Sequence, residues 1–250
     1  MQVKNALIGY SGFIGSNLLK FKNKFHKYNS KNINKIKNKK YNLVICAGTS
    51  SKIWLAKKKP SLDLNKIKYL INNLKKVKAK KFVLISTCEV YGLSKNQKEN
   101  SLTFSNKNYH YGNNRLMLEN FVKKNFKKSY ILRLPIVYGK NFNKNCIFDL
   151  IYNNNIEKLN GSDKIQIYNV NNLKKHINLV LKNNISVLNI SSKPIQLNWI
   201  AEHFFNIKLN KKKIYRNMKM QTIHGKSNND YFLSQKKCID DLREFIKKTK

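Results

Sequence analysis

The fold is decided by one stretch of the sequence, VKNALIGYSGFIGSNLLK, which runs from Val3 to Lys20. Its first part, residues 3–8, is mostly apolar and predicts a short buried strand. Residues 16–20 predict a helix, and a glycine-rich turn at residues 9–15 joins the two. A strand that runs through such a turn into a helix forms an anion site, because free backbone N–H groups and the positive end of the helix dipole point to one place.

Three glycines define the turn. Gly9 allows a sharp change of direction, Gly12 lets the backbone approach a pyrophosphate, and Gly15 lets the helix pack closely on the strand. Their spacing, G-x-x-G-x-x-G, differs by one residue from the G-x-G-x-x-G dinucleotide fingerprint, so an ordinary glycine-rich turn is the alternative. The position directly after a strand favours a dinucleotide site. We expect it to be built by Gly9, Ser11, Gly12, Phe13, Ile14 and Gly15.

The composition is that of a globular chain. Its 250 residues suit one large domain, with or without a small appendage, and 41% apolar residues suffice for a core. No apolar run approaches the ~20 residues of a membrane span, and the N-terminus lacks a signal-peptide layout. The four cysteines are scattered, which indicates reduced thiols in a cytoplasm, and the histidines lack metal-ligand spacing. We therefore expect a cytoplasmic protein without a metal.

The net charge of +39 is unusual, and its source is lysine: 47 Lys stand against 4 Arg. One hypothesis is a nucleic-acid-binding protein, but it depends on charge alone. Nucleic-acid surfaces favour Arg, and here the Lys residues are spread along the chain. Together with 39 Asn, they are typical of an AT-rich genome. We expect no nucleic-acid partner, although part of the charge would attract a diphosphate substrate.

Strand patterns alternate with helical ones along the chain, which predicts a doubly wound parallel α/β sheet with helices on both faces. Strands are expected at residues 25–28, 42–48, 81–85, 130–135, 164–170 and 187–190. Helices are expected at residues 60–77, 111–126, 173–181, 197–205 and 238–246. Ligands of such sheets bind beyond the carboxyl ends of the strands, where Gly9, Ala47, Gly48 and Thr87 fall.

The end of the second strand bears on the choice of coenzyme. Folds that prefer NAD usually carry an acid there for the adenosine ribose, whereas this chain has Asn29 and Ser30. Lys27 or Lys31 would neutralise a 2′-phosphate, which favours NADP over NAD. The alternative is that both are ordinary surface lysines.

Tyr111 and Arg115 are four residues apart near the start of a helix and therefore share a face. A guanidinium beside a phenol favours the phenolate and lowers its pKa, and a tyrosine tuned in this way can exchange a proton near neutral pH. A structural Tyr–Arg contact is the alternative, and the pair alone does not establish catalysis.

Four motifs in register resemble the extended short-chain dehydrogenase/reductase superfamily, and within it the NAD-dependent epimerase/dehydratase family of nucleotide-sugar enzymes. The first is the glycine-rich turn. The second, Ser86-Thr87-Cys88-Glu89-Val90-Tyr91-Gly92, resembles S-[ST]-x-x-V-Y-G. The third, Tyr111-x-x-x-Arg115 followed by Glu119, resembles Y-x-x-x-K…E. The fourth, residues 132–139, resembles L-R-x-x-x-V-Y-G. The resemblance is good to about residue 190.

The resemblance implies a Rossmann-type core at residues 1–139, with a return segment at 164–190, and a small, abridged substrate-binding part at 140–163 and 191–250. Thr87 would bind the substrate oxygen, Tyr111 would be the general acid/base, and Arg115 would replace the family lysine at the nicotinamide ribose. Pro135 would border the nicotinamide. Glu89 and Arg216 are candidates for substrate contacts, although an ordinary surface arginine is the better interpretation of Arg216. Helices near residues 62–77 and 111–126 would form a homodimer.

Several positions depart from the family pattern. Arg115 is bulkier than lysine and permanently charged. Cys88 occupies the position of an Asp in sugar 4,6-dehydratases, which argues against 4,6-dehydration, although Glu89 is retained. The leading hypothesis is therefore an NAD(P)-dependent epimerase or reductase of a nucleotide sugar in surface-polysaccharide synthesis. A non-catalytic dinucleotide-binding protein, acting as a sensor or complex subunit, is the alternative.

Overall fold

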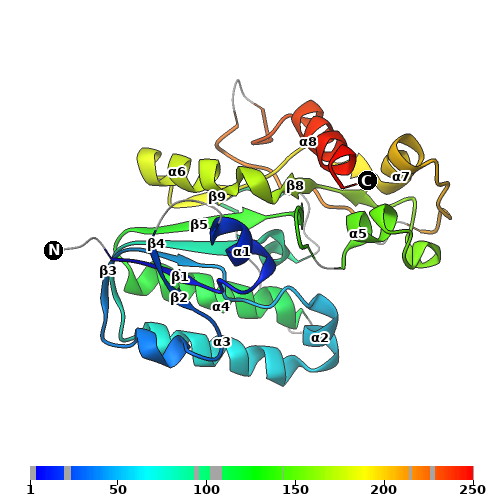
Figure 1. Cartoon of the computed structure of the whole chain (residues 1–250). Helices are drawn as coiled ribbons and strands as arrows, with labels where there is room; N and C mark the ends of the chain where they lie inside the picture. The colour runs from blue at the N-terminus through cyan, green and yellow to red at the C-terminus, as the bar shows by residue number, and fades with distance from the viewer. Residues whose placement is uncertain are drawn as a thin grey trace. The chain divides into compact units, whose positions relative to one another are not determined.

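The computed structural model describes residues 4–19, 24–92, 96–101, 109–142, 144–213, 216–225 and 229–249, so Val3 and Lys20 lie outside it. The chain forms two compact units (Figure 1). The first comprises Met1–Gly92, Leu102–Arg133 and Leu173–Leu188, and the second comprises Leu93–Ser101, Leu134–Asn172 and Asn189–Lys250.

The first unit is built on a six-stranded sheet. Its strands, in chain order, are β1 (Asn5–Ile8), β2 (Phe25–Tyr28), β3 (Lys40–Cys46), β4 (Lys78–Thr87), β5 (Ser129–Leu134) and β9 (Val187–Asn189). They are arranged in the order β2-β1-β3-β4-β5-β9. The pairs β1–β2, β1–β3 and β3–β4 are parallel. Near-continuous burial along β1 and β5 reflects their apolar sequences, as expected for strands covered on both faces.

Helices lie on both sides of this sheet, which confirms the predicted doubly wound class. Figure 1 shows α3 (Pro60–Leu74) and α4 (His110–Asn125) on one face and α6 (Leu173–Asn183) on the other. The unit also contains α1 (Phe13–Leu19), η1 (Ile33–Ile36), α2 (Ile53–Lys58) and η2 (Cys88–Tyr91). Proline at the first position of α3 suits a helix start. The predicted apolar face of α3 is buried, from Ile67 to Leu74, in the main core cluster.

The strand order reverses between β1 and β3. After β2 the chain returns to the other side of β1 within residues 29–39, and this connection contains only the single turn η1. The carboxyl ends of β1 and β3 stay paired, at Ile8 and Cys46, but the connections that follow them separate. The crevice between such connections is where ligands of open α/β sheets bind.

The second unit holds shorter elements, and two small two-stranded sheets join them. One pairs β6 (Ile136–Tyr138) with β8 (Ile167–Asn169) in parallel, and the other pairs β7 (Lys164–Ile165) with β10 (Ile195–Gln196) in antiparallel. The expected single strand at 164–170 is therefore two strands with different partners. The helical elements are α5 (Cys146–Ile151), η3 (Ile156–Lys158), η4 (Val170–Asn172), α7 (Leu197–Phe205) and α8 (Gln235–Lys247).

Two polar side chains, the buried Gln166 and the partly buried Glu99, join these short elements. Gln166 donates from Nε2 to the carbonyl oxygens of Ser192 and Met220, and its Oε1 accepts from the Met220 N–H. Glu99 accepts hydrogen bonds from the Asn189 N–H, the Thr222 hydroxyl and the Ile223 N–H. Segments far apart in the sequence are thereby fixed without long strands, because buried polar groups need partners.

Candidate functional site

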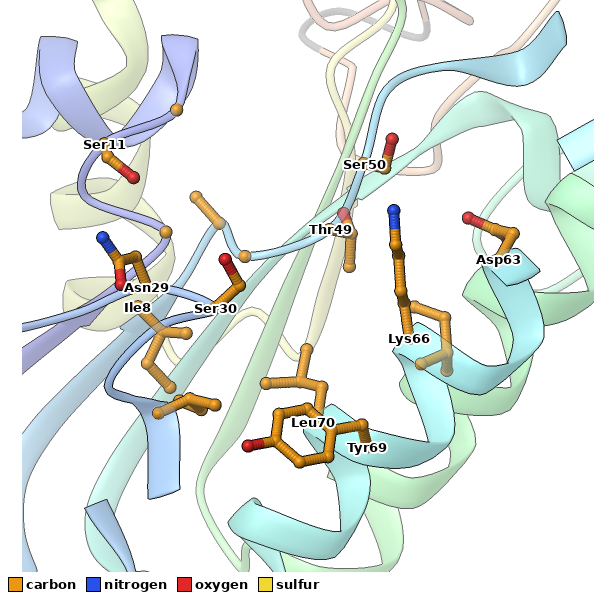
Figure 2. A pocket seen from close by; sticks show the side chains of 16 residues that line it. Ile8, Ser11, Asn29, Ser30, Thr49, Ser50, Asp63, Lys66, Tyr69 and Leu70 are labelled. Atoms are coloured by element: carbon orange, nitrogen blue, oxygen red, sulfur yellow. The ribbon is translucent and has the colours of Figure 1, made fainter. Parts of the chain in front are cut away.

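A cavity of about 340 Å³ lies in the first unit at the carboxyl ends of β1 and β3. That volume is within the range of small-molecule sites. Figure 2 shows residues from several connections around it. The cavity is lined by Ile8, Gly9, Ser11, Gly12, Asn29, Ser30, Ile33, Ala47, Gly48, Thr49, Ser50, Asp63, Lys66, Ile67, Tyr69 and Leu70. The structure thus brings together several residues that the sequence analysis predicted from separate patterns: Gly9, Ser11, Gly12, Asn29, Ser30, Ala47 and Gly48.

The three turn glycines have different tasks. Gly9 has φ +83° and a Cβ there would overlap the Ala47 carbonyl, so no other residue fits. A Cβ on Gly15 would overlap the Gly9 carbonyl, which explains the close packing of α1 on the turn. A Cβ on Gly12 would meet only the Gly9 oxygen at 3.4 Å, which is an ordinary contact. Of the three, Gly9 and Gly12 line the cavity, whereas Gly15, like Phe13 and Ile14, does not.

The cavity fits the pyrophosphate and adenosine end of a dinucleotide. The bare backbone at Gly12 forms a cradle that a side chain would fill, and apolar side chains of η1 and α3 provide a surface for a base. No acid follows β2. Asn29 there accepts from the Lys31 N–H at 2.9 Å and donates to the Tyr10 hydroxyl at 3.3 Å, which ties the β2 end to the glycine-rich turn.

The lysine that lines the cavity is neither Lys27 nor Lys31 but Lys66 of α3. Its side chain extends towards the part of the cavity where Thr49 and Ser50 lie (Figure 2). Because neither Lys27 nor Lys31 lines the cavity, the lining does not support a role of these lysines in binding a 2′-phosphate. The preference for NADP stays a prediction.

Alanine at Gly12 and at Gly15 should separate coenzyme binding from folding. Gly12→Ala is expected to keep the thermal stability of the wild type and to weaken NAD or NADPH binding at least 10-fold, because the new methyl group enters the cradle. Gly15→Ala should lower the melting temperature, because its methyl group overlaps backbone. Calorimetry of both variants checks this. Equal loss of stability in both would contradict the assignment of tasks.

Tyr111 and Arg115 lie beside this cavity. The Tyr111 hydroxyl donates to the Ser50 carbonyl at 3.2 Å, and Arg115 Nη2 donates to the same oxygen at 2.7 Å. Arg115 also forms a bidentate ion pair with Asp63 of α3, with both N–O distances 2.9 Å. Its guanidinium carbon lies 4.2 Å from the Tyr111 ring centroid. Since Ser50 and Asp63 line the cavity, the predicted acid/base residue borders it.

The predicted fall in the Tyr111 pKa is wrong in direction. Burial raises this pKa most strongly, and Arg115 lowers it, but Glu89 and Asp63 raise it again, so the pKa lies above the ordinary value of 10. The sequence prediction considered Arg115 alone. It missed both the burial of the phenol and the carboxylate that neutralises the guanidinium.

Thr87 is the last residue of β4, and Glu89 lies in η2, which follows it. The Glu89 N–H donates to Thr87 Oγ1 at 3.2 Å, and the Tyr109 hydroxyl donates to the Glu89 carboxylate. Both side chains are partly exposed. Their expected contacts with substrate stay predictions.

Other motif residues form one buried network. Arg133 Nη2 pairs with Glu119 Oε2 at 2.6 Å, and Arg133 Nη1 donates to the Tyr91 hydroxyl. Ser86 Oγ donates to the same Glu119 carboxylate. Members of three of the quoted motifs thus join β4, η2, α4 and β5 as a structural unit.

Pro135 and Arg216 belong to the second unit. Pro135 separates β5 from β6. The Arg216 N–H donates to Asp163 Oδ1 at 3.0 Å. Burial raises the pKa of the Cys146 thiol to about 11, and the charge of Arg216 opposes that rise. Their predicted roles at nicotinamide and substrate are not tested by these contacts.

Thr49, Ser50, Asp63 and Lys66 are among the cavity residues that the sequence analysis missed. A signal for Asp63 was present, because it is the first acidic residue of a chain with only 12. An isolated acid in the first turn of an amphipathic helix is more often a surface residue, so its long-range partner could not be inferred.

Three features define an α/β protein of the dinucleotide-binding class. They are the reversed strand order, the glycine-lined cavity, and the contacts of Tyr111 with Arg115 and the Ser50 carbonyl beside that cavity. A profile of the NAD dependent epimerase/dehydratase family matches residues 24–179, which is more than half of the chain. The chain therefore belongs to this family. A search of the curated proteins finds no match.

Solved structures confirm the fold. A UDP-glucuronic acid 4-epimerase from Bacillus cereus, a tyrosine-to-phenylalanine variant solved with NAD and a fluorinated substrate analogue, superposes with TM-score 0.75 at 18% identity, covering 99% of this chain and 100% of that one. A dTDP-4-dehydrorhamnose reductase from Clostridium acetobutylicum gives 0.74 at 18% identity, covering 99% of both. The Bacillus anthracis reductase in complex with NADP gives 0.72 at 18% identity and covers all of both chains.

Within the described residues, no helix is both long and apolar enough to cross a membrane.

Proposed function

We propose that this protein is an NAD(P)-dependent epimerase or reductase of a nucleotide sugar, with Tyr111 as the general acid/base. One observation carries the proposal. Ser50 lines the glycine-rich cavity, and its carbonyl oxygen accepts hydrogen bonds from Tyr111 and Arg115. The candidate proton carrier is therefore held at the border of the candidate coenzyme site.

Each residue has a task in this proposal. Gly9, Ser11 and Gly12 hold the pyrophosphate, and Asn29 and Ser30 bind the adenosine ribose. The bound coenzyme supplies hydride chemistry at its nicotinamide ring. Thr87 hydrogen-bonds the reacting oxygen of the sugar, and Tyr111 moves the proton of that oxygen. Arg115 fixes Tyr111 through its ring and through the Ser50 carbonyl.

Membership of the family and the structural neighbours support a sugar nucleotide as substrate, because the Bacillus cereus epimerase was solved with an analogue of UDP-glucuronic acid. In the proposal, Glu89 and Arg216 are the candidates for contacts with the sugar nucleotide. The setting is surface-polysaccharide synthesis in the cytoplasm. Exposed Leu62 on α3 and exposed Met117 on α4 support a homodimer through these helices.

A non-catalytic dinucleotide-binding protein is the second candidate. The observation that favours it is the ion pair with Asp63, which holds the arginine that stands in for the family lysine. In that function the cavity would bind a dinucleotide, and Tyr111 would serve only to fix the Ser50 segment.

The first test is to purify the protein, denature it and identify any nucleotide that is released. Stoichiometric NAD is expected of an epimerase, which reduces and reoxidises its coenzyme within one turnover. A protein without nucleotide that then binds NADPH in a fluorescence titration indicates a reductase, which exchanges coenzyme at each turnover. A protein that binds neither coenzyme contradicts the proposal. Bound coenzyme without turnover on any nucleotide sugar supports the second candidate.

A further inference from the structure

Asp63 is the centre of a buried cluster between α3 and α4. Its carboxylate accepts two hydrogen bonds from Arg115 and one from Asn114 Nδ2 at 2.8 Å. Arg115 is 2% exposed and Asp63 5% exposed. Burial raises the Asp63 pKa, but these hydrogen bonds and the charges of Arg115 and Lys66 outweigh it, so the pKa lies below 3.8. Asp63 is therefore a carboxylate at neutral pH.

The positive charge nearest to Tyr111 is consequently already matched. The Arg115 guanidinium stacks on the Tyr111 ring, yet both of its terminal nitrogens are bonded to Asp63. A lysine at this position would present an ammonium group without that fork of two parallel hydrogen bonds. The Asp63–Arg115 pair is close to neutral as a unit, so it stabilises a phenolate on Tyr111 far less than a free cation would.

The hydrogen bond of Tyr111 also favours the protonated phenol over the phenolate. Its hydroxyl meets the backbone carbonyl of Ser50, which can only accept, so this bond exists only while Tyr111 is protonated. The charged groups that act on Tyr111 are Arg115 on its own helix, Asp63 on α3 and Glu89 on η2. Two of the three are acids, and both disfavour the phenolate.

We propose that Asp63 is a positioning residue for the reaction: by holding the Arg115 guanidinium it favours the protonated form of Tyr111, so that the site gives a proton to its substrate. This proposal rests on the proposed function and deepens it. The reaction served is reduction of a keto group. The carbonyl carbon takes a hydride from the reduced nicotinamide coenzyme, the oxygen takes the Tyr111 proton, and solvent reprotonates Tyr111. The products are the hydroxyl group and oxidised coenzyme.

The test is an NMR titration of the full chain labelled with ¹³C at tyrosine Cζ, which needs neither coenzyme nor substrate. The Tyr111 signal is assigned by its loss in Tyr111→Phe. In the wild type it should stay at the phenol position beyond pH 10, where exposed tyrosines titrate. In Asp63→Asn the Arg115 charge is no longer matched, and the Tyr111 midpoint should fall by about one pH unit or more. Asp149→Asn, in the second unit, is the matched control and should leave Tyr111 unchanged.

A wild-type midpoint at or below pH 10 overturns the proposal whether or not the variant folds. A folded Asp63→Asn protein with an unchanged midpoint overturns it as well, since a merely structural role of Asp63 would not move the titration. The NMR titration does not depend on coenzyme, so the two tests are independent. A failed coenzyme titration would reject the proposed function, whereas the NMR titration alone decides whether Asp63 acts on Tyr111.

Discussion

Tyr111→Phe is expected to lower kcat by about 10²–10⁴-fold, because it removes the group that moves the proton of the reacting oxygen. Coenzyme affinity should change little, since Tyr111 is not among the cavity residues. The ring is retained, so its stacking with Arg115 is also retained. The measurement is steady-state turnover of the nucleotide sugar that the wild type converts, together with a coenzyme titration.

Two control variants sharpen this result. Tyr130→Phe also deletes a buried hydroxyl, which donates to Asn184 in the first unit, and it should leave kcat unchanged. Tyr109→Phe removes the partner of Glu89, two residues before Tyr111. If Tyr109→Phe stops turnover and Tyr111→Phe does not, the acid/base role belongs to the Tyr109–Glu89 pair and the present assignment is wrong.

Arg133→Leu is expected to lower the free energy of unfolding of the first unit by about 3–5 kcal/mol, the usual cost of removing one partner of a buried ion pair. Glu119 is fully buried and would keep only the Ser86 hydroxyl as a partner in the network described above. Tyr91 would lose its hydrogen bond and the guanidinium 4.8 Å from its ring centroid. Urea unfolding followed by circular dichroism measures the loss.

The matched control for this loss is Arg243→Leu, which breaks the surface pair with Asp240, where both side chains are more than 40% exposed. Its cost should stay below about 1 kcal/mol. Replacing Glu119 together with Arg133 by leucine should recover much of the stability, because no buried charge is then left unpaired. If Arg133→Leu costs no more than Arg243→Leu, the buried network is not a main contributor to stability.

Local patterns were sufficient to predict several elements of both units. The strand at 25–28 and the helix at 197–205 begin and end where they were predicted. The apolar face of α3 is also buried as its spacing of three and four residues indicated. These features depend on neighbours in the sequence, which is why periodicity and turn residues report them.

Features that depend on distant residues were not predictable in this way. The strand order places β3 beside β1 and not beside β2, the strand that precedes it in the chain, and no local pattern encodes that choice. Likewise, Asp63 and Arg115 are 52 residues apart, so their pairing and its effect on the Tyr111 pKa appear only in the folded chain. The division of residues 164–169 between β7 and β8 depends equally on partners elsewhere.

The short connection between β2 and β3 also matters for protein engineering. Residues 29–39 contain one helical turn and no strand, so β2 is an edge strand of its sheet. The exposed Lys24 and Lys27 discourage this edge from pairing with other molecules. An inserted helix and strand at this connection would extend the sheet outward while β1, β3 and their register stay as they are. The dinucleotide cavity would then gain a longer wall on its β2 side, and its ligand preference could be redesigned from that wall alone.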